Sequence, residues 1–437
     1  MRRRRFDVLI VGAGPAGSIA ALVLARAGAS VALLDKAQFP RDKACGDFVG
    51  PRGLQVLADL GIAEPPGLDV GDMVVIGPTG RRVVLPCFHG VTYPGRARAI
   101  PRTVLDDALR TAALDAGAIA FAGRADRPLG SGGDIDGFTV SEGGGEELRA
   151  DFVIGADGAT SHVAQSAGLV EGSRVLWGFA VRCYLDQHVD LPAITLWEQT
   201  RWHAFPGYGW IFPNPGGMAN IGLGIGTLAD RQVGADAVRS LPAYFDHLVD
   251  LGLIARAPVS PLPRRLGGWL KMGMVGTTPA TGRVLLVGDA AGLVNPLQGE
   301  GIAQAMTSGR SAAEAVLGSP GHAAARYRDD LVRAHLPYQR ISAAGHAALV
   351  GRPRAIAALG RMLTAPVLGS GLAGGWGIFW NELLDGAASG GARCVATAST
   401  WFGQAVTART DVSHWFSTTF DGREDGQQSG PGWSSQR

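Results

Sequence analysis

The sequence predicts an α/β protein in which a Rossmann-like domain carries an inserted antiparallel β-sheet and is followed by a helical C-terminal region. Three observations support this fold class. An apolar run over residues 8–11 leads directly into a glycine turn. Apolar residues largely alternate with a period of two over residues 177–274, and the pattern past residue 302 is mainly helical. With 437 residues, 46% of them hydrophobic, the chain is long enough for a large core.

The first element is a strand–turn–helix–strand unit at the N-terminus. Its turn reads Gly12-Ala-Gly-Pro-Ala-Gly17. Gly12 permits the tight turn, Gly14 lets the backbone approach a phosphate, and Gly17 lets the helix pack against the strand. Asp35 follows the second apolar run, about where an acid that binds ribose is expected. A chance match is the alternative in a chain with 65 glycines, but the flanking βαβ pattern favours a dinucleotide site.

The elements that follow are expected in chain order. Residues 51–60 form a short helix, and residues 70–100 form short strands. A helix begins at Thr103, with Asp106 and Asp107 in its first turn, where the helix dipole favours negative charge. A buried strand ends near Ile154, one helix at about residues 232–252 interrupts the antiparallel sheet, and residues 283–287 return to the buried-strand pattern.

These elements predict a division of the chain. The nucleotide-binding domain takes residues 1–70, 98–174 and 275–330, and the β-sheet domain that binds substrate takes residues 71–97 and 175–274. Residues 331–425 form the helical C-terminal region, and the polar tail 426–437 is disordered.

Composition excludes several classes of function. The balance of 40 basic against 38 acidic side chains implies no nucleic-acid partner. The four cysteines and nine histidines show no metal-ligand spacing, so we expect no metal site and a reducing, cytoplasmic location. Four arginines before the first apolar run resemble an export signal, but cleavage there would remove the strand that feeds the glycine turn. We interpret them as a solvated N-terminal tail.

Three later segments point to a flavin dinucleotide. Buried strands end at Asp157-Gly158 and at Gly288-Asp289, and a glycine turn over residues 295–302 opens a helix. An extended flavin dinucleotide needs a pyrophosphate site, an anchor for its ribityl chain and a positive helix end near its ring. Asp289 can accept hydrogen bonds from ribityl hydroxyls. The free N–H groups that open the helix after Gly301 would stabilise negative charge at N1 and O2 of the reduced flavin.

The motifs GAGPAG, GADG and GDAAGLVNPLQGEGI, in this order, resemble those of the FAD-dependent superfamily of aromatic hydroxylases, flavin halogenases and geranylgeranyl reductases. Two further segments resemble the geranylgeranyl reductase family in particular. They are the cysteine-containing loop at residues 39–47 and the YxWxFP signature at residues 206–213. Within that family, the bacterial menaquinone reductases, which saturate one isoprene of a quinone tail, look most similar. The resemblance covers residues 6–330 well and the helical C-terminus only loosely.

The resemblance implies an aromatic-hydroxylase-type FAD site, with roles for individual residues. The glycine turn would hold the pyrophosphate, Asp35 the adenosine ribose, Arg102 the dinucleotide and Asp289 the ribityl chain. Gly299 and Gly301 would lie against the isoalloxazine. The complete set of expected cofactor-binding residues is Gly12, Gly14, Pro15, Ala16, Gly17, Asp35, Lys36, Arg41, Cys45, Gly46, Arg102, Asp157, Gly158, Gly288, Asp289, Pro296, Gly299, Gly301 and Ile302.

The resemblance also implies a catalytic pocket. Cys45 and Gly46 would line the substrate side of the flavin, with Tyr208 and Trp210 as the opposite wall. The alternatives are that Cys45 is a small buried hydrophobe and that Tyr208 and Trp210 are ordinary sheet core. Departures from the family pattern leave the substrate open. Ala164 stands where an arginine often closes the GADG segment, Asp35 replaces the more usual glutamate, and Pro206 and Tyr208 are separated by one residue where some members have two.

The expected reaction is reduction of a C=C bond in a polyprenyl chain, geranylgeranyl or menaquinone side chain, by hydride transfer from N5 of the reduced flavin. A dry aromatic pocket would align the alkene with N5. No obvious acid stands beside the signatures, so the proton would come from water or a tyrosine. The alternative is an FAD-dependent monooxygenase (hydroxylase) of a tailoring pathway. A halogenase is less favoured because the 206–213 segment lacks the WxWxIP pattern, and a non-enzymatic flavin- or lipid-binding protein is disfavoured because the ring-side motifs are intact.

Two expectations concern partners. The chain has no second GxGxxG with a helical context, so an external reductant is expected: NAD(P)H, reduced ferredoxin or reduced flavin, with an electron-donor protein as partner in the second case. The hydrophobic small-molecule substrate lives in the bilayer, and the apolar segment 365–380, with Trp376 and Trp380, suits peripheral contact with the inner face of the membrane. Burial of that segment against the FAD domain is the equal alternative.

Overall fold

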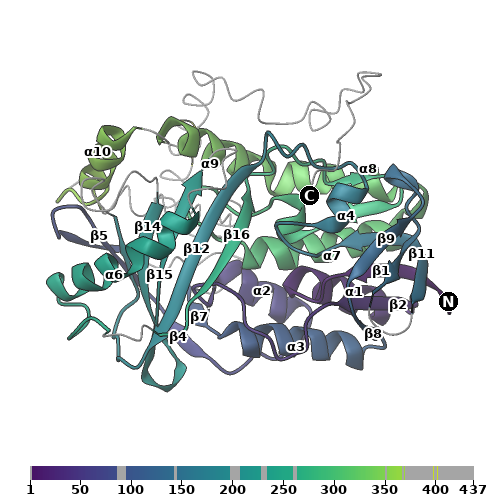
Figure 1. Ribbon diagram of the computed structural model, residues 1–437, viewed down its shortest axis with the longest axis horizontal. Helices are drawn as coiled ribbons and strands as arrows, with labels where there is room; N and C mark the ends of the chain where they lie inside the picture. The colour runs from purple at the N-terminus through teal and green to yellow at the C-terminus, as the bar shows by residue number, and fades with distance from the viewer. Residues whose placement is uncertain are drawn as a thin grey trace.

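The computed structural model describes residues 2–85, 95–141, 145–196, 207–227, 234–258, 263–349 and 352–366, together with residues 369, 397 and 401. Two β-sheets form the centres of two lobes that lie side by side along the long axis of the molecule (Figure 1). The N-terminal glycine turn belongs to the first lobe and the 207–214 strand to the second. The α/β class and the mixture of sheets with C-terminal helices that the sequence predicts are confirmed.

The first sheet forms the nucleotide-type core. Its parallel strands run in the order β18-β11-β1-β2-β8, with β17 antiparallel at one edge and the β9–β10 hairpin attached to β11. The carboxyl-terminal parts of β1 and β11, residues 8–11 and 152–154, are continuously apolar because both faces of the sheet are covered there. The strands of this sheet are β1 (Arg3–Val11), β2 (Val31–Asp35), β8 (Ile119–Ala122), β9 (Ala125–Leu129), β10 (Gly137–Val140), β11 (Glu146–Gly155), β17 (Ala280–Thr281) and β18 (Val284–Leu286).

The second sheet has the order β16-β12-β15-β14-β13-β5-β6. Its strands are β5 (Met73–Ile76), β6 (Arg82–Leu85), β12 (Leu176–Leu185), β13 (Ala193–Thr195), β14 (Gly207–Asn214), β15 (Met218–Thr227) and β16 (Leu266–Met272). All pairs are antiparallel except β5 with β13, which are parallel. A small third sheet joins β3 (Phe48–Val49), β7 (Ala97–Ala99) and β4 (Leu68–Val70) near the junction of the lobes.

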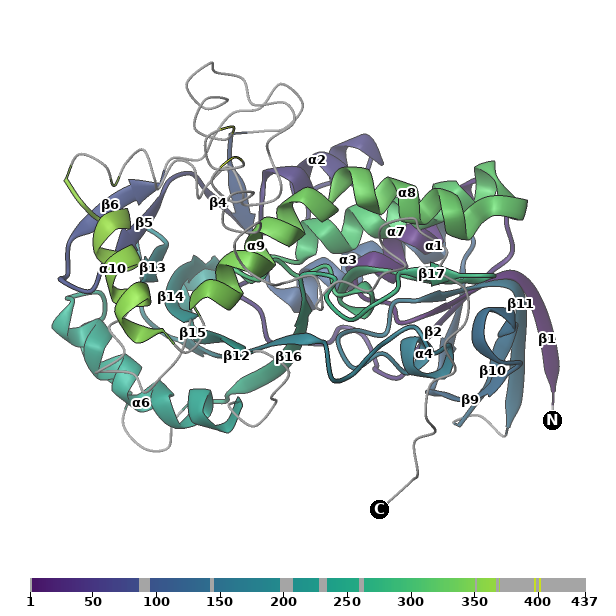
Figure 2. The same cartoon turned by 90° about the horizontal axis from the view of Figure 1, so that it is seen from above.

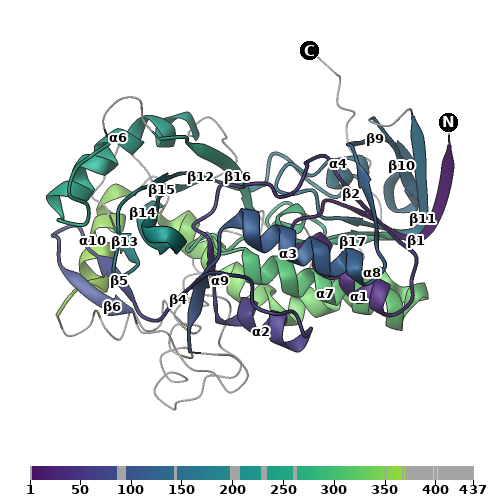
Figure 3. The same cartoon turned by 90° about the horizontal axis from the view of Figure 1, so that it is seen from below.

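Helices cover the sheets as follows. Helices α1, α3 and α7 pack together beside the parallel sheet, while α4 and the β9–β10 hairpin lie on its other side (Figures 2 and 3). Helix α6 covers the outer face of the second sheet, and α10 lies at the far end of that sheet (Figure 2). The helices are α1 (Pro15–Arg26), α2 (Pro51–Asp59), α3 (Arg102–Asp115), α4 (His162–Ser166), α6 (Gly234–Asp250), α7 (Ile302–Gly318), α8 (Ala323–Ala334), α9 (Leu336–Leu349) and α10 (Pro353–Leu363).

Two sequence-based interpretations of local structure are wrong. Helix α3 begins at Arg102 rather than Thr103, so Asp106 and Asp107 fall in its second turn, and Asp106 binds Arg102 instead of the helix terminus. The N-terminal arginines are not a solvated tail. Arg3 and Arg4 extend β1, where they pair with Glu147 and Glu146 of the neighbouring strand β11. Opposite charges that face each other across adjacent strands favour this longer pairing.

The segment expected to contact the membrane, residues 365–380 with Trp376 and Trp380, lies almost entirely outside the described residues. Among the helices of the described ranges, none combines the length and apolar character needed to cross a bilayer.

Candidate active site

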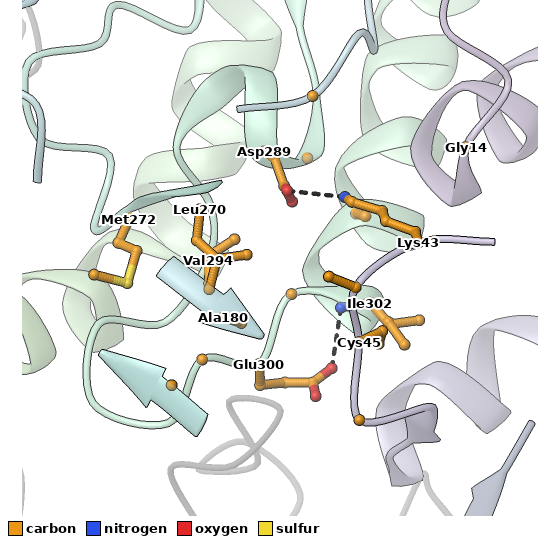
Figure 4. Close-up of a pocket in the computed structure, with 18 of the residues that line it drawn as sticks. Gly14, Lys43, Cys45, Ala180, Leu270, Met272, Asp289, Val294, Glu300 and Ile302 are labelled. Carbon is orange, nitrogen blue, oxygen red and sulfur yellow. Dashed lines mark hydrogen bonds and ion pairs between the residues drawn. The ribbon is translucent and has the colours of Figure 1, made fainter. Parts of the chain in front are cut away.

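A cavity of about 1100 Å³ lies where the two lobes meet. It is lined by the glycine turn, the loop around Cys45, strand β14, the 287–302 segment and helices α9 and α10. Side chains from these segments approach one another from opposite sides in Figure 4. Every residue expected at the cofactor site or catalytic pocket lines this cavity except Gly17, which lies behind it.

The glycine turn is shaped by contacts that only glycine allows. A Cβ on Gly12 would lie 2.3 Å from the carbonyl oxygen of Ala156, and φ at Gly12 is +106°. A Cβ on Gly17 would lie 1.9 Å from the carbonyl oxygen of Gly12, so Gly17 lets α1 pack against the turn. Helix α1 begins at Pro15, with no side chain capping it and no acid in its first turn. Its N-terminus therefore faces the cavity as an anion-binding site.

Basic groups surround this helix terminus. A Cβ on Gly14 would lie 3.3 Å from Nη2 of Arg41, so the guanidinium sits directly beside the turn. Arg41 is held by an ion pair with Asp106 at 3.0 Å. Arg102 is buried and makes a bidentate pair with the same carboxylate, at 2.7 Å for each bond. Two guanidiniums that share one buried carboxylate leave positive charge directed to the cavity, which suits a pyrophosphate.

Asp35 and Asp157, two acids expected to bind the cofactor, line the part of the cavity near the glycine turn, called here the nucleotide end. Asp35 lines the cavity, and its carboxylate accepts hydrogen bonds from the N–H groups of Ala13 at 2.7 Å and Ala37 at 2.8 Å. Asp157 also lines the cavity, but its carboxylate accepts from the N–H groups of His162 and Val163. Asp157 therefore stabilises the N-terminus of α4, which leaves less of its carboxylate available to a ligand.

Asp289 lies in the short 3-10 helix Gly288–Ala291, just beyond the carboxyl end of β18, and reaches into the cavity. Its Oδ2 lies 3.1 Å from Nζ of Lys43, which comes from the opposite wall (Figure 4). Lys271 is buried nearby, and burial lowers its pKa to about 8 while the charges of Asp157 and Asp289 oppose that shift. Neither lysine was predicted from the sequence: Lys43 lies within the 39–47 segment but was not assigned a role there, and Lys271 lies outside the motifs. The lysine–aspartate pair shows that Asp289 can hold a polar group at this position.

The turn before α7 corrects two expectations. The N–H groups of Ile302 and Ala303 are not free, because Oε1 of Glu300 accepts from them at 3.1 Å and 3.2 Å (Figure 4). A carboxylate just before a helix satisfies the unpaired donors of the first turn. Glu300 also lines the cavity, so an acid does stand beside the signatures. Its place inside the 295–302 motif was the available signal.

The residues expected in the catalytic pocket come together in the part of the cavity lined by Cys45, Tyr208, Trp210 and Gly299, called here the ring end. Oη of Tyr208 donates a hydrogen bond to the carbonyl of Gln298, and a Cβ on Gly299 would lie 3.2 Å from that oxygen. Trp210 is buried and its Nε1 donates to Oδ1 of Asn220 at 3.0 Å. Burial raises the pKa of Tyr208 and of the Cys45 thiol, so both groups keep their protons at neutral pH.

The cavity continues away from the nucleotide end as an apolar arm. Helices α9 and α10 contribute to its lining, although they come from the part of the chain with the weakest sequence signal. Gly360 of α10 packs against Pro78 and Leu196, and a Cβ there would lie 3.1 Å from the Pro78 ring. The residues of the arm are Met73, Ile194, Leu196, Leu270, Met272, Leu349, Ile356, Leu359 and Leu363. These apolar side chains suit a long hydrocarbon.

The described residues contain no cluster of three or more histidine, cysteine or acidic side chains arranged to hold a metal ion. The groups present fit a dinucleotide instead. An uncapped helix terminus and two guanidiniums meet at the glycine turn, and Asp289 lies just after strand β18. This combination of a dinucleotide-binding lobe and a large cavity with an apolar part is typical of the class of FAD-dependent oxidoreductases.

Comparisons with known proteins agree. A family described as FAD binding domain matches residues 5–181. Menaquinone reductase of Mycolicibacterium smegmatis is 38% identical over 323 residues, which cover 71% of this chain and 76% of the relative. Digeranylgeranylglycerophospholipid reductase 2 of Methanopyrus kandleri is 34% identical and covers 71% of this chain and 76% of its own. The chain belongs to the geranylgeranyl reductase family of FAD-dependent oxidoreductases.

Solved structures share the fold. A geranylgeranyl bacteriochlorophyll reductase-like protein from Thermoplasma acidophilum matches with a TM-score of 0.71 and 21% identity, covering 92% of this chain and all of its own. A flavin-dependent brominase matches with a TM-score of 0.67 and 19% identity over 92% of this chain and all of its own. Because a reductase-like protein and a brominase share this architecture, the fold alone does not define the reaction.

Proposed function

We propose that this protein reduces C=C bonds in the polyprenyl chain of a hydrophobic substrate. The observation that carries the proposal is the apolar arm, which is continuous with the nucleotide end of one cavity. A hydrocarbon chain threaded through that arm would reach the segment around Gly299 and Tyr208 along apolar side chains. The relatives named menaquinone reductase and digeranylgeranylglycerophospholipid reductase support a prenylated lipid as the substrate class.

The roles of this chain's residues follow from their positions. The N-terminus of α1, Arg41 and Arg102 would hold the pyrophosphate, and Asp35 the ribose. Asp289 would hold the ribityl chain by exchanging its contact with Lys43 for ribityl hydroxyls. When bound and reduced, FAD supplies the hydride for the alkene. Tyr208, Trp210 and Cys45 would orient the alkene and exclude water, and Tyr208 or a water beside it would supply the proton.

An external reductant completes the proposed reaction. The chain presents one glycine turn of the dinucleotide type, and the FAD would occupy it. Electrons would therefore come from NAD(P)H, reduced ferredoxin or reduced flavin, bound transiently. Reducing the holoenzyme with each donor in turn under argon, and following the loss of flavin absorbance, identifies which one the protein accepts.

The test of the proposed function is made without oxygen. The holoenzyme is reduced, and a prenylated quinone or prenol is added. We expect the flavin to be reoxidised, because an alkene accepts the hydride directly. A saturated analogue of the same chain length is the control and should leave the flavin reduced. Reoxidation that requires oxygen would support a hydroxylase instead and would contradict the proposal.

We also propose that the protein contacts a membrane surface, since a polyprenyl substrate dissolves in the bilayer. The tryptophans of the 365–380 segment are the expected anchors. Wild type should float with anionic liposomes, and a Trp376→Ser, Trp380→Ser double variant should float less. Equal flotation of the two proteins, or none, would remove the membrane proposal and leave the flavin assignment intact.

A further inference from the structure

The loop of residues 42–47, which contains Cys45 and is called here the cysteine loop, is attached to the second sheet by side chains of three strands. Arg182 of β12 forms an ion pair with Asp42 and donates to the carbonyl of Lys43 at 3.3 Å. Asn220 of β15 donates to the carbonyl of Cys45 at 2.8 Å. These bonds join the first lobe to the sheet that forms the opposite wall of the cavity.

Asp47 is the centre of this attachment. Its side chain is 0% exposed, and Oδ2 accepts three hydrogen bonds. The donors are Oη of Tyr184 at 2.6 Å, Nδ2 of Asn214 at 2.9 Å and Nδ2 of Asn220 at 2.8 Å. Asp47 also has a φ of 65°, a conformation that residues other than glycine seldom adopt. A buried carboxylate at such a position persists only when its surroundings hold it there.

Asn220 connects Asp47 to the aromatic wall of the cavity, which is formed by Tyr208, Trp210 and Phe212. One amide nitrogen donates to both Asp47 and the carbonyl of Cys45, while the amide oxygen accepts from Nε1 of Trp210 at 3.0 Å. Gly46 packs against the same wall, where a Cβ would lie 2.9 Å from the ring of Phe212. The cysteine loop and the strands that carry Trp210 and Phe212 therefore share one polar network with Asp47 at its centre. The Arg182 guanidinium lies beside this network, 4.1 Å from the centre of the Tyr184 ring.

We propose that Asp47 is a positioning residue that fixes the cysteine loop and the Trp210 indole relative to each other, and thereby sets how the substrate alkene meets the cofactor. This inference rests on the proposed function and deepens it. Asp47 does not line the cavity, so it acts through Cys45, Gly46 and Trp210 rather than on the substrate. A small displacement of either wall would misalign the reacting atoms and lower turnover more than substrate binding.

The variants are made in the holoenzyme. Tyr184→Phe removes one donor to Asp47, and Asp47→Asn changes the acceptor itself. Tyr244→Phe is the matched control, since Tyr244 of α6 also has a buried hydroxyl, which accepts a hydrogen bond from Thr195 of the second sheet at 3.1 Å, and it lies outside the lining of the cavity. Two quantities are measured: anaerobic reoxidation of the reduced flavin by a prenylated substrate, and the rate at which iodoacetamide alkylates Cys45.

We expect the Tyr184→Phe protein to retain its FAD and its apparent affinity for the substrate. Reoxidation of its flavin at saturating substrate should be slower than in wild type by about tenfold or more, and alkylation of its Cys45 should be faster. Tyr244→Phe should match wild type in both assays. Tyr184→Phe behaving as wild type in both assays would overturn the proposal, and so would equal changes in Tyr184→Phe and Tyr244→Phe. If wild type itself shows no reaction with the substrate while Tyr184→Phe still speeds alkylation, the proposed function fails and the role of Asp47 in holding the loop stands.

Discussion

Replacing Asp289 by alanine should yield a folded protein that has lost its FAD. Asp289 lies in the short 3-10 helix Gly288–Ala291 that follows strand β18, and its side chain is almost buried yet reaches the cavity, where it pairs with Lys43. A charged group that accepts two ribityl hydroxyls contributes roughly 1.5–3 kcal/mol per hydrogen bond. The variant should therefore bind FAD about 100-fold more weakly or worse. Flavin absorbance of the purified protein and titration of the apoprotein measure the loss.

The control for that variant is Asp59→Ala, which removes a half-exposed acid paired with Arg310 on the surface. It should keep full FAD occupancy. Circular dichroism should show that both variants retain the fold of wild type. An Asp289→Ala protein that binds FAD as wild type does would show that the ribityl chain is held elsewhere and that Asp289 serves only to hold Lys43.

Replacing Trp210 by alanine should have the opposite pattern, with FAD retained and turnover lost. The indole is buried between the strand and the cavity, and its ring lies where a Cβ on Gly222 would clash at 2.2 Å. Its removal opens the aromatic wall and releases Asn220 from one hydrogen bond. We expect turnover to fall by about 100-fold, together with a loss of about 3–5 kcal/mol in stability from the cavity created. Tyr208→Ala should show the same kinetic pattern.

Stability and catalysis are separated by two further variants. Trp210→Phe keeps most of the ring volume but has no indole N–H, so it should fold as wild type does and still turn over slowly. Trp269→Phe alters a tryptophan on β16 that packs against Trp177 and Phe179 and does not line the cavity. It should keep wild-type turnover. Loss of FAD from both Trp210→Ala and Tyr208→Ala would instead assign these residues to the core that supports the nucleotide.

Local signals made the nucleotide end of the site predictable. The glycine turn and the 288–302 segment are contiguous motifs, and Asp35 lies at the end of a strand. The role of each in binding a cofactor can be inferred from local sequence and backbone geometry. Gly12, for example, has a positive φ that a glycine-rich turn after a strand requires. The period-two pattern likewise predicted the second sheet, because each of its strands alternates between the cavity face and the face under α6.

The polar network around Asp47 could not be predicted in the same way. Tyr184, Asn214 and Asn220 lie far along the chain from Asp47, and each looks like an ordinary strand residue. Only the pairing of β12, β14 and β15 brings their donors to one carboxylate. Glu300 was misjudged for a different reason. The helix-opening motif was recognised, but its own acid was not considered as the group that satisfies the first turn.

The most direct test of the central claim is the mass of the product. Holoenzyme, an electron donor and a prenylated quinone or prenol are incubated without oxygen, and the extracted lipid is analysed by mass spectrometry. We expect a product that carries two more hydrogen atoms than the substrate, with one isoprene unit saturated. An unchanged lipid without oxygen, and a product that gains an oxygen atom once air is admitted, would contradict it.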